Sequence, residues 1–69
     1  MNSATNYAPV SNHEIQKAMK IIFDDLHRNG KIISSEHVEN SSRYVIEYES
    51  VTYAFTLDRA HKCTSITIL

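Results

Sequence analysis

The chain has 69 residues and a mass of 7.9 kDa, so it holds one domain near the lower size limit for a self-sufficient hydrophobic core, and we expect it to oligomerise. Seven Lys and Arg against eight Asp and Glu give a formal charge of −1. The two signs are interspersed along the chain, so nothing in the charge pattern resembles a polyphosphate-binding surface or an acidic mimic of DNA. A single Gly, Pro and Cys exclude a glycine-rich phosphate loop and an intrachain disulfide.

The first nine residues, 1–9, are polar and show neither a basic start nor an apolar run. This composition predicts a flexible arm rather than a secretory signal or a membrane span. Together with a cysteine that has no disulfide partner, it leads us to expect a cytoplasmic protein with no membrane contact. Residues 10–69 are expected to form one α+β domain.

Residues 10–30 predict one amphipathic helix, on which the rest of the chain depends for its packing. Ser11 and Glu14 have the spacing of a capping box, in which each side chain bonds the backbone amide of the other residue at the start of a helix. Gly30, which follows Asn29, is expected to take the left-handed conformation that commonly ends a helix. Local sequence therefore predicts both ends of the helix.

Apolar residues recur within this helix at intervals of three and four and form one stripe. The stripe contains Ile15, Ala18, Met19, Ile22 and Leu26. Phe23 lies at its margin and is expected in the core. Ile21 falls well away from it, between Asp25 and Arg28, where an isoleucine is either incidentally exposed or a contact for a partner or a second copy.

The remainder of the chain reads as strands. Residues 31–38 predict a first strand, whose weak alternation indicates an edge or irregular position. The polar residues 39–42 predict a turn, residues 58–62 a loop, and residues 63–69 a last strand.

Between these segments, two runs of alternating apolar residues predict a hairpin. The runs are Tyr44, Ile46 and Tyr48, then Val51, Tyr53, Phe55 and Leu57. If Glu49 and Ser50 form a two-residue turn, Tyr48 faces Val51, and the other pairs follow so that all seven side chains share one face. Because Glu-Ser is a poor sequence for the primed turns of hairpins, a longer or bulged connection stays open.

These elements predict an α+β fold, with an N-terminal helix packed on one face of a four-stranded antiparallel meander sheet, because short connections make successive strands pair in order. The predicted core is Ile15, Met19, Ile22, Leu26, Tyr44, Ile46, Tyr53, Phe55, Leu57, Ile66 and Ile68. The opposite sheet face is small and uncharged at its centre, around Val45 and Ala54, and is one candidate dimer surface.

Four histidines and one cysteine do not amount to a metal site. His13 and His27 are separated by about 21 Å of helix rise and cannot hold one ion. His61 and Cys63 could point the same way, with His37 approaching from another strand, but stable sites need three or four ligands. His61 could also activate Cys63 as a nucleophile, yet so small a chain has little room for a shaped pocket. We therefore expect no metal, no cofactor and no enzymatic activity.

The aromatic side of the hairpin is a kind of surface on which single-stranded nucleic acid can stack. Bases stacked there would uncover the only surface available to the helix stripe, so core membership is the better interpretation. In a different nucleic-acid contact, a basic tip would bind phosphates, and basic residues of the helix would extend this basic patch. The tip is Arg59, His61 and Lys62, and the helix residues are Lys17, Lys20 or Arg28.

The last predicted strand carries few charges that would discourage pairing at an open sheet edge. A second copy, or an extended segment of another protein, could add a strand there. We therefore predict a small non-catalytic intracellular binding protein that regulates or inhibits a partner protein and acts as a homodimer. Its predicted partner-binding residues are Ile21, Asp25, Arg28, Ile66, Ile68 and Leu69. The alternative is a nucleic-acid-binding regulator that contacts phosphates through the basic tip and the basic helix face.

Overall fold

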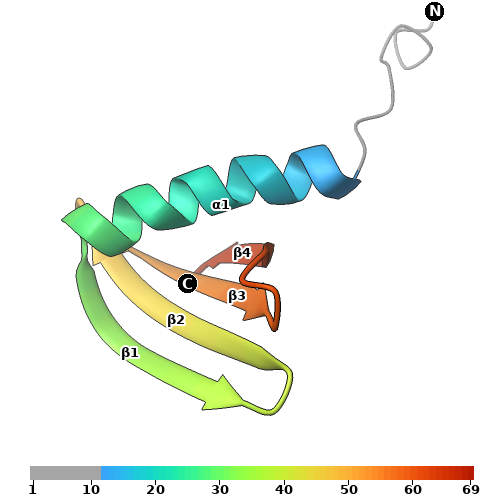
Figure 1. Ribbon diagram of the computed structural model, residues 1–69. Helices are drawn as coiled ribbons and strands as arrows, with labels where there is room; N and C mark the ends of the chain where they lie inside the picture. The colour runs from blue at the N-terminus through green and yellow to red at the C-terminus, as the bar shows by residue number, and fades with distance from the viewer. Residues whose placement is uncertain (1–11) are drawn as a thin grey trace, which may run out of the picture.

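The computed structural model describes residues 12–69, which form one helix over a four-stranded sheet (Figure 1). Helix α1 spans Asn12–Asn29 and is followed by β1 (Lys31–Val38), β2 (Ser41–Tyr48), β3 (Val51–Asp58) and β4 (Cys63–Ile68). The strands pair antiparallel in the order β1-β2-β3-β4. The predicted α+β meander is therefore confirmed, whereas the predicted arm and the capping residue Ser11 lie outside the described residues.

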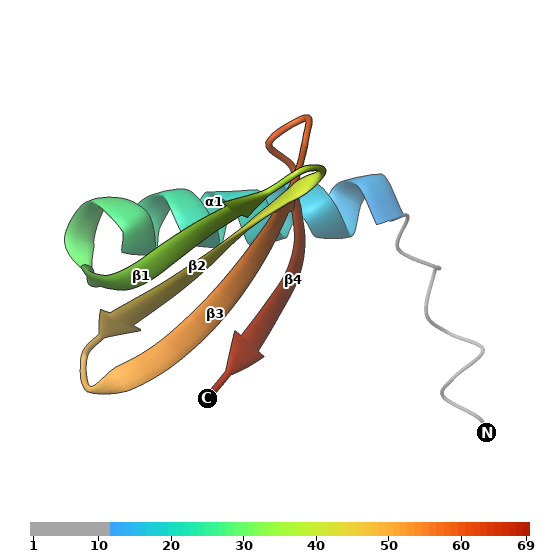
Figure 2. The same ribbon diagram turned by 90° about the horizontal axis from the view of Figure 1, so that it is seen from below.

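The helix crosses one face of the sheet obliquely, and the far end of β4 extends beyond it (Figure 2). It contacts β4 most extensively, then β2 and β1. The described part of the chain contains no helix long and apolar enough to cross a bilayer.

The core lies between α1 and the two central strands. It consists of Phe23, Leu26, Ile46, Phe55, Leu57 and Cys63, with Met19, Tyr44, Tyr48, Tyr53 and Ile66 packed against it. The aromatic side of the hairpin is thus covered by the helix, as predicted. Phe23 is the centre of this contact, because its ring lies 5.1 Å from that of Tyr44 and 5.2 Å from that of Phe55 between centroids.

The helix is rotated about its axis relative to the predicted stripe. Ile15 and Ile22 are 43 % and 45 % exposed, so their prediction as core residues is wrong. The reason is geometric: the helix turns its bulkiest apolar side chain, Phe23, toward the sheet, and residues about 100° away on one flank are carried to the surface. Apolar spacing alone did not distinguish the two orientations.

Gly30 ends the helix for a different reason from the one predicted. No glycine of the described chain has a positive φ, so the left-handed conformation expected of Gly30 is wrong. A Cβ atom at this position would lie 2.7 Å from the Ile46 Cγ2 atom and 2.9 Å from the carbonyl oxygen of Glu47. Glycine therefore permits close approach of the helix end to β2.

The predicted hairpin register is confirmed throughout. Tyr48 pairs with Val51, and the same register pairs Ile46 with Tyr53 and Tyr44 with Phe55. The turn has only two residues, Glu49 and Ser50, with φ values of 50° and 68°. Positive φ at both positions is the property of the primed turn that matches the strand twist, so the turn residues adopt it despite their unfavourable sequence.

Both edge strands are irregular. Every residue of the first, β1, is exposed, and the strand contains a bulge between Ile32 and Ser34, which confirms its predicted edge character. The connection from β1 to β2 is shorter than predicted, because Ser41 already pairs with Val38.

The last strand, β4, has an irregularity that lets Cys63 pair with Leu57 and enter the core, where it is fully buried. Ile66 packs against the core, whereas Ile68 is 68 % exposed and its prediction as a core residue is wrong. It lies where β4 has passed beyond the helix, so the helix does not cover it.

Candidate functional site

The outer edge of β4 presents unpaired backbone groups. The amide of Leu69 donates to the carbonyl oxygen of Thr52, which continues the ladder to β3 past the end of the strand. Because these bonds alternate along an antiparallel strand, the amides of Ile66 and Ile68 point away from β3. The strand contains no charged residue, and its irregularity lies at its first residues, beside Cys63. Residues 65–68 therefore carry neither of these two features that discourage pairing with another strand.

Uncovered apolar side chains accompany this edge. Ile68 and Leu69 are exposed at the end of β4, and Ile15 and Ile22 are exposed on the helix. The opposite flank of the helix faces the loop that precedes β4, and β4 runs from that loop to the far side of the helix (Figure 2). Ile15 and Ile22 therefore lie on the same side of the helix as the end of β4.

The other surfaces are less suited to strand addition. Although β1 is also an edge, it carries Lys31 and Glu36 and is bent by its bulge, features that discourage pairing. On the open sheet face, the central residues Val45 and Ala54 are only 8 % and 5 % exposed. They leave little apolar area for a partner to bury, which makes that face a weaker candidate dimer surface than the β4 edge.

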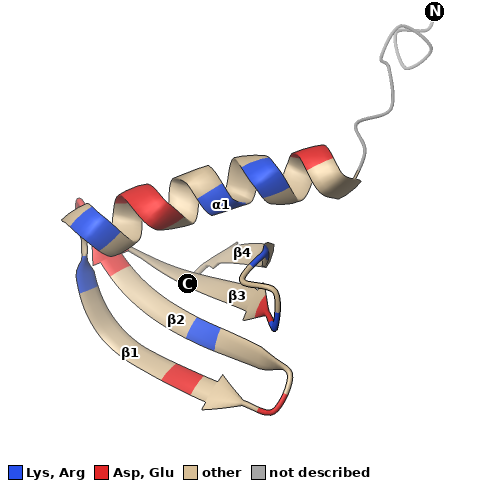
Figure 3. Ribbon diagram, in the orientation of Figure 1, with Lys and Arg blue, Asp and Glu red and all other residues tan. Residues whose placement is uncertain are grey.

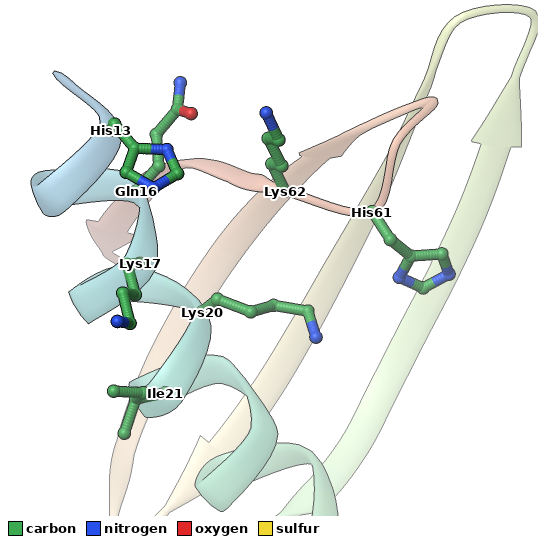
Figure 4. A pocket seen from close by; sticks show the side chains of 7 residues that line it. All are labelled: His13, Gln16, Lys17, Lys20, Ile21, His61 and Lys62. Carbon is green, nitrogen blue, oxygen red and sulfur yellow. The ribbon is translucent and has the colours of Figure 1, made fainter.

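A second surface is a basic hollow between the helix and the loop that joins β3 to β4 (Figure 4). Its volume is about 250 Å³. The first turns of α1 contribute His13, Gln16, Lys17, Lys20 and Ile21, and the loop contributes His61 and Lys62. Figure 3 shows the basic segments of the helix and the loop facing one another. We call these seven residues the basic groove.

Asp58 holds the loop side of the groove in one conformation. Its Oδ1 atom accepts hydrogen bonds from the amides of Ala60 and Lys62, each at 2.9 Å. Its own amide donates to the carbonyl oxygen of Lys62, and the amide of His61 donates back to the carbonyl oxygen of Asp58. These bonds stabilise His61 at a φ of 66°, a left-handed conformation that costs energy for a residue with a side chain.

The lysines of the groove differ in their pairing. Nζ of Lys20 lies 3.0 Å from Oδ1 of Asp24, one helical turn away. Neither Lys17 nor Lys62 takes part in this ion pair. The stems of the three lysines line the groove, and Figure 4 shows their ammonium groups ending in different directions around it.

The predicted basic tip is divided by the structure. Lys62 lines the groove with Lys17 and Lys20, whereas Arg59 lines a neighbouring hollow with His37. His61 borders both hollows. Arg28 is at the other end of the helix, outside the groove. His13 and Gln16 were missed as candidates. His13 precedes Lys17 by four residues and Gln16 precedes Lys20 by four, which puts them on one helix flank, but only the fold shows that the loop lies beside this flank.

The outer helix face keeps the other predicted contact residues. Ile21 is 63 % exposed and borders the basic groove. Asp25 accepts a hydrogen bond from the side-chain amide of Asn29 at 2.7 Å. A partner contact at Ile21, Asp25 and Arg28 stays a prediction.

The candidate nucleophile and metal ligands are not brought together. Burial raises the pKa of the Cys63 thiol, and its Sγ atom donates to the carbonyl oxygen of Ser65 at 3.5 Å. His61 is exposed on the groove, and Nδ1 of His37 lies 2.8 Å from Oγ of Ser42. No group of three or more His, Cys, Asp or Glu within residues 12–69 has the arrangement of a metal site.

Comparisons of this chain with protein-family models, with curated proteins and with solved structures find no match.

Proposed function

We propose that this protein is a small non-catalytic binding protein that acts as a homodimer and regulates or inhibits a partner protein. One observation carries the proposal: the uncharged open edge of β4 and the exposed apolar residues Ile68 and Leu69 lie together at the same end of the sheet. Exposed edges of this kind are sites of strand addition. We assign this edge to a second copy of the chain.

The second copy is favoured because β4 is complementary to itself. Two antiparallel β4 strands related by a twofold axis would place the helix-side residues Ile66 and Ile68 of one copy beside those of the other. The sheet would become continuous, and both helices would cover the same face. Since β4 has no charged residue, this arrangement opposes no like charges.

The non-catalytic role is supported by the position of the one candidate nucleophile. Cys63 is fully buried in the core, and burial raises its pKa, so the thiolate that catalysis would need is disfavoured. A buried free thiol also suits a reducing compartment, and we propose a cytoplasmic location on this ground.

The experiment is a measurement of molecular mass by sedimentation equilibrium at micromolar concentration. We expect a mass near twice 7.9 kDa for the unmodified chain. The Ile68→Lys variant should return to the monomer mass, because it places a charged side chain in the apolar contact between the two strands.

Val38→Lys is the matched control, because Val38 is also 68 % exposed but lies on the opposite edge strand, β1. This variant should stay dimeric. A monomeric unmodified chain, or dissociation by Val38→Lys rather than by Ile68→Lys, would contradict the proposal.

A further inference from the structure

We propose that the basic groove holds one large apolar side chain of an acidic segment of another protein. This proposal rests on the proposed function, because it names the kind of partner that such a binding protein recognises. The groove lies between the start of α1 and the loop before β4, away from the exposed end of that strand (Figure 2). A partner segment in the groove would therefore leave β4 free to pair with a second copy.

The lining of the groove is almost wholly apolar. The exposed side chain of Ile21 and the methylene stems of Lys17, Lys20 and Lys62 form its walls. An apolar side chain placed between these walls would remove their surface from water, which is the main favourable contribution to most protein association. The lining therefore favours an apolar occupant over an ion.

The size of the groove suits one side chain rather than a whole small ligand. Its volume of about 250 Å³ lies below the roughly 300–1,000 Å³ of pockets that enclose drug-sized ligands. Protein interfaces commonly place one large side chain of one partner in a small pocket of the other, and that anchor contributes much of the binding energy. An aromatic or long aliphatic side chain is an anchor of this kind.

The charges around the groove select the residues that flank the anchor. Of the described residues that line it, three are lysines and none is acidic, although the whole chain has a formal charge of −1. The three ammonium groups end in different directions (Figure 4), which does not suit one small anion. This arrangement is instead complementary to carboxylates spaced along a peptide on either side of its anchor.

Both walls of the groove are formed in advance. Asp58 accepts hydrogen bonds from the backbone amides of Ala60 and Lys62, which fix the conformation of the loop. The helix supplies the other wall, where the ion pair with Asp24 holds the side chain of Lys20. Less conformational entropy is lost on binding when the surface is already ordered, so a single anchor and a few carboxylates are a sufficient recognition element.

The experiment is a selection from a phage-displayed library of random peptides on the immobilised full chain, with a parallel selection on the Ile21→Ser variant. Peptides enriched only on the unmodified chain are those whose binding depends on the groove. We expect these peptides to share one large apolar residue flanked by Asp or Glu. The absence of any peptide that depends on Ile21, or flanks that are uncharged or basic, would overturn the proposal.

The most enriched peptide is then synthesised with a fluorescent label, and its binding to each variant is measured by anisotropy. Lys17→Gln and Lys62→Gln keep most of the apolar stem and should each weaken binding by about fivefold, the effect of one solvent-exposed charge at contact distance. Lys31→Gln removes the same charge beyond the other end of the helix and should leave affinity unchanged. Equal losses in all three variants would overturn the proposal, because they would show an unlocalised effect of net charge.

The apolar part of the contact has its own control. Ile33 is also more than half exposed but lies on β1, so Ile33→Ser should leave the affinity for the peptide unchanged while Ile21→Ser abolishes it. Added salt should weaken binding to the unmodified chain without abolishing it, because the anchor contact is not screened. Equal losses in the two serine variants would contradict an anchor site in the groove.

Sedimentation of the same proteins separates this proposal from the homodimer. The Ile21→Ser variant should keep the unfolding midpoint and the mass of the unmodified chain. If the unmodified chain were dimeric and this variant monomeric, the groove would hold a second copy, and the proposal would be overturned. A monomeric unmodified chain that still binds the selected peptides would contradict the homodimer and support the groove.

Discussion

The ring of Phe23 in the helix meets the ring of Phe55 in the middle of the sheet edge-on, with centroids 5.2 Å apart and planes inclined at 68°. This is a favoured geometry for aromatic pairs. Because both side chains are almost completely buried, the contact fixes which flank of the helix faces the sheet and which is left for other partners.

Phe23→Ala should therefore lower the free energy of unfolding by about 3–5 kcal/mol or prevent folding. Its neighbour Ile22 provides the control, since Ile22→Ala removes a side chain that is half exposed and should cost less than about 1 kcal/mol. Urea denaturation of both variants measures the difference. Equal losses would show that the helix packs through the stripe predicted from spacing.

Gly30→Ala should lower the free energy of unfolding by about 1–3 kcal/mol, because the new methyl group would overlap Ile46 and two backbone oxygens. Alanine favours helices more than glycine does, so propensity alone predicts the opposite sign. A denaturation midpoint equal to that of the parent chain would contradict the close approach of the helix end to β2.

The turn at Glu49 and Ser50 should accept a better sequence. The double variant Glu49→Asn, Ser50→Gly should raise the free energy of unfolding by about 0.5–1 kcal/mol, because asparagine and glycine adopt positive φ at lower cost. Ser50→Val should have the opposite effect, since a β-branched residue is strained there. Thermal unfolding of the two variants tests the sign of each change.

The Cys63 thiol should make stability decrease in alkaline solution. Burial raises its pKa above the ordinary value of 9.0, so above that pH the folded chain keeps a proton that the unfolded chain has lost. The stabilisation that the neutral thiol gives the folded chain is complete below the pKa of the unfolded chain. It is lost as the pH rises through the raised pKa of the folded chain. The Cys63→Ala variant should have a lower free energy of unfolding than the parent chain at every pH. Its free energy of unfolding should fall less steeply between roughly pH 8.5 and 10.5, the range in which a thiol ionises.

The same burial predicts slow labelling of Cys63 by a thiol reagent in the folded chain and rapid labelling in urea. The ratio of the two rates should follow the free energy of unfolding. Rapid labelling without denaturant would show that the thiol is accessible in the native state.

Local sequence alone determined the elements and the pairing of the central strands. Alternation over Tyr44–Tyr48 and Val51–Leu57 predicts the hairpin register that the structure shows, because side chains alternate with a period of two and a shift of one residue would expose the whole apolar set. Because the alternation puts the aromatic residues on one face, it also predicted that the helix covers that face, as it does in the structure. Weak alternation in residues 31–38 correctly marked an edge.

Tertiary packing decided what periodicity leaves open. Helical spacing defines an apolar face only to within about 100°, so the shape of Phe23 and the surface of the sheet determined the rotation that exposes Ile22. The irregular pairing of β4 determined that Cys63 is buried while Ile68 is exposed. The basic groove also belongs to this level, because Lys17 and Lys62 are far apart in sequence and line one hollow only when the loop folds back beside the helix.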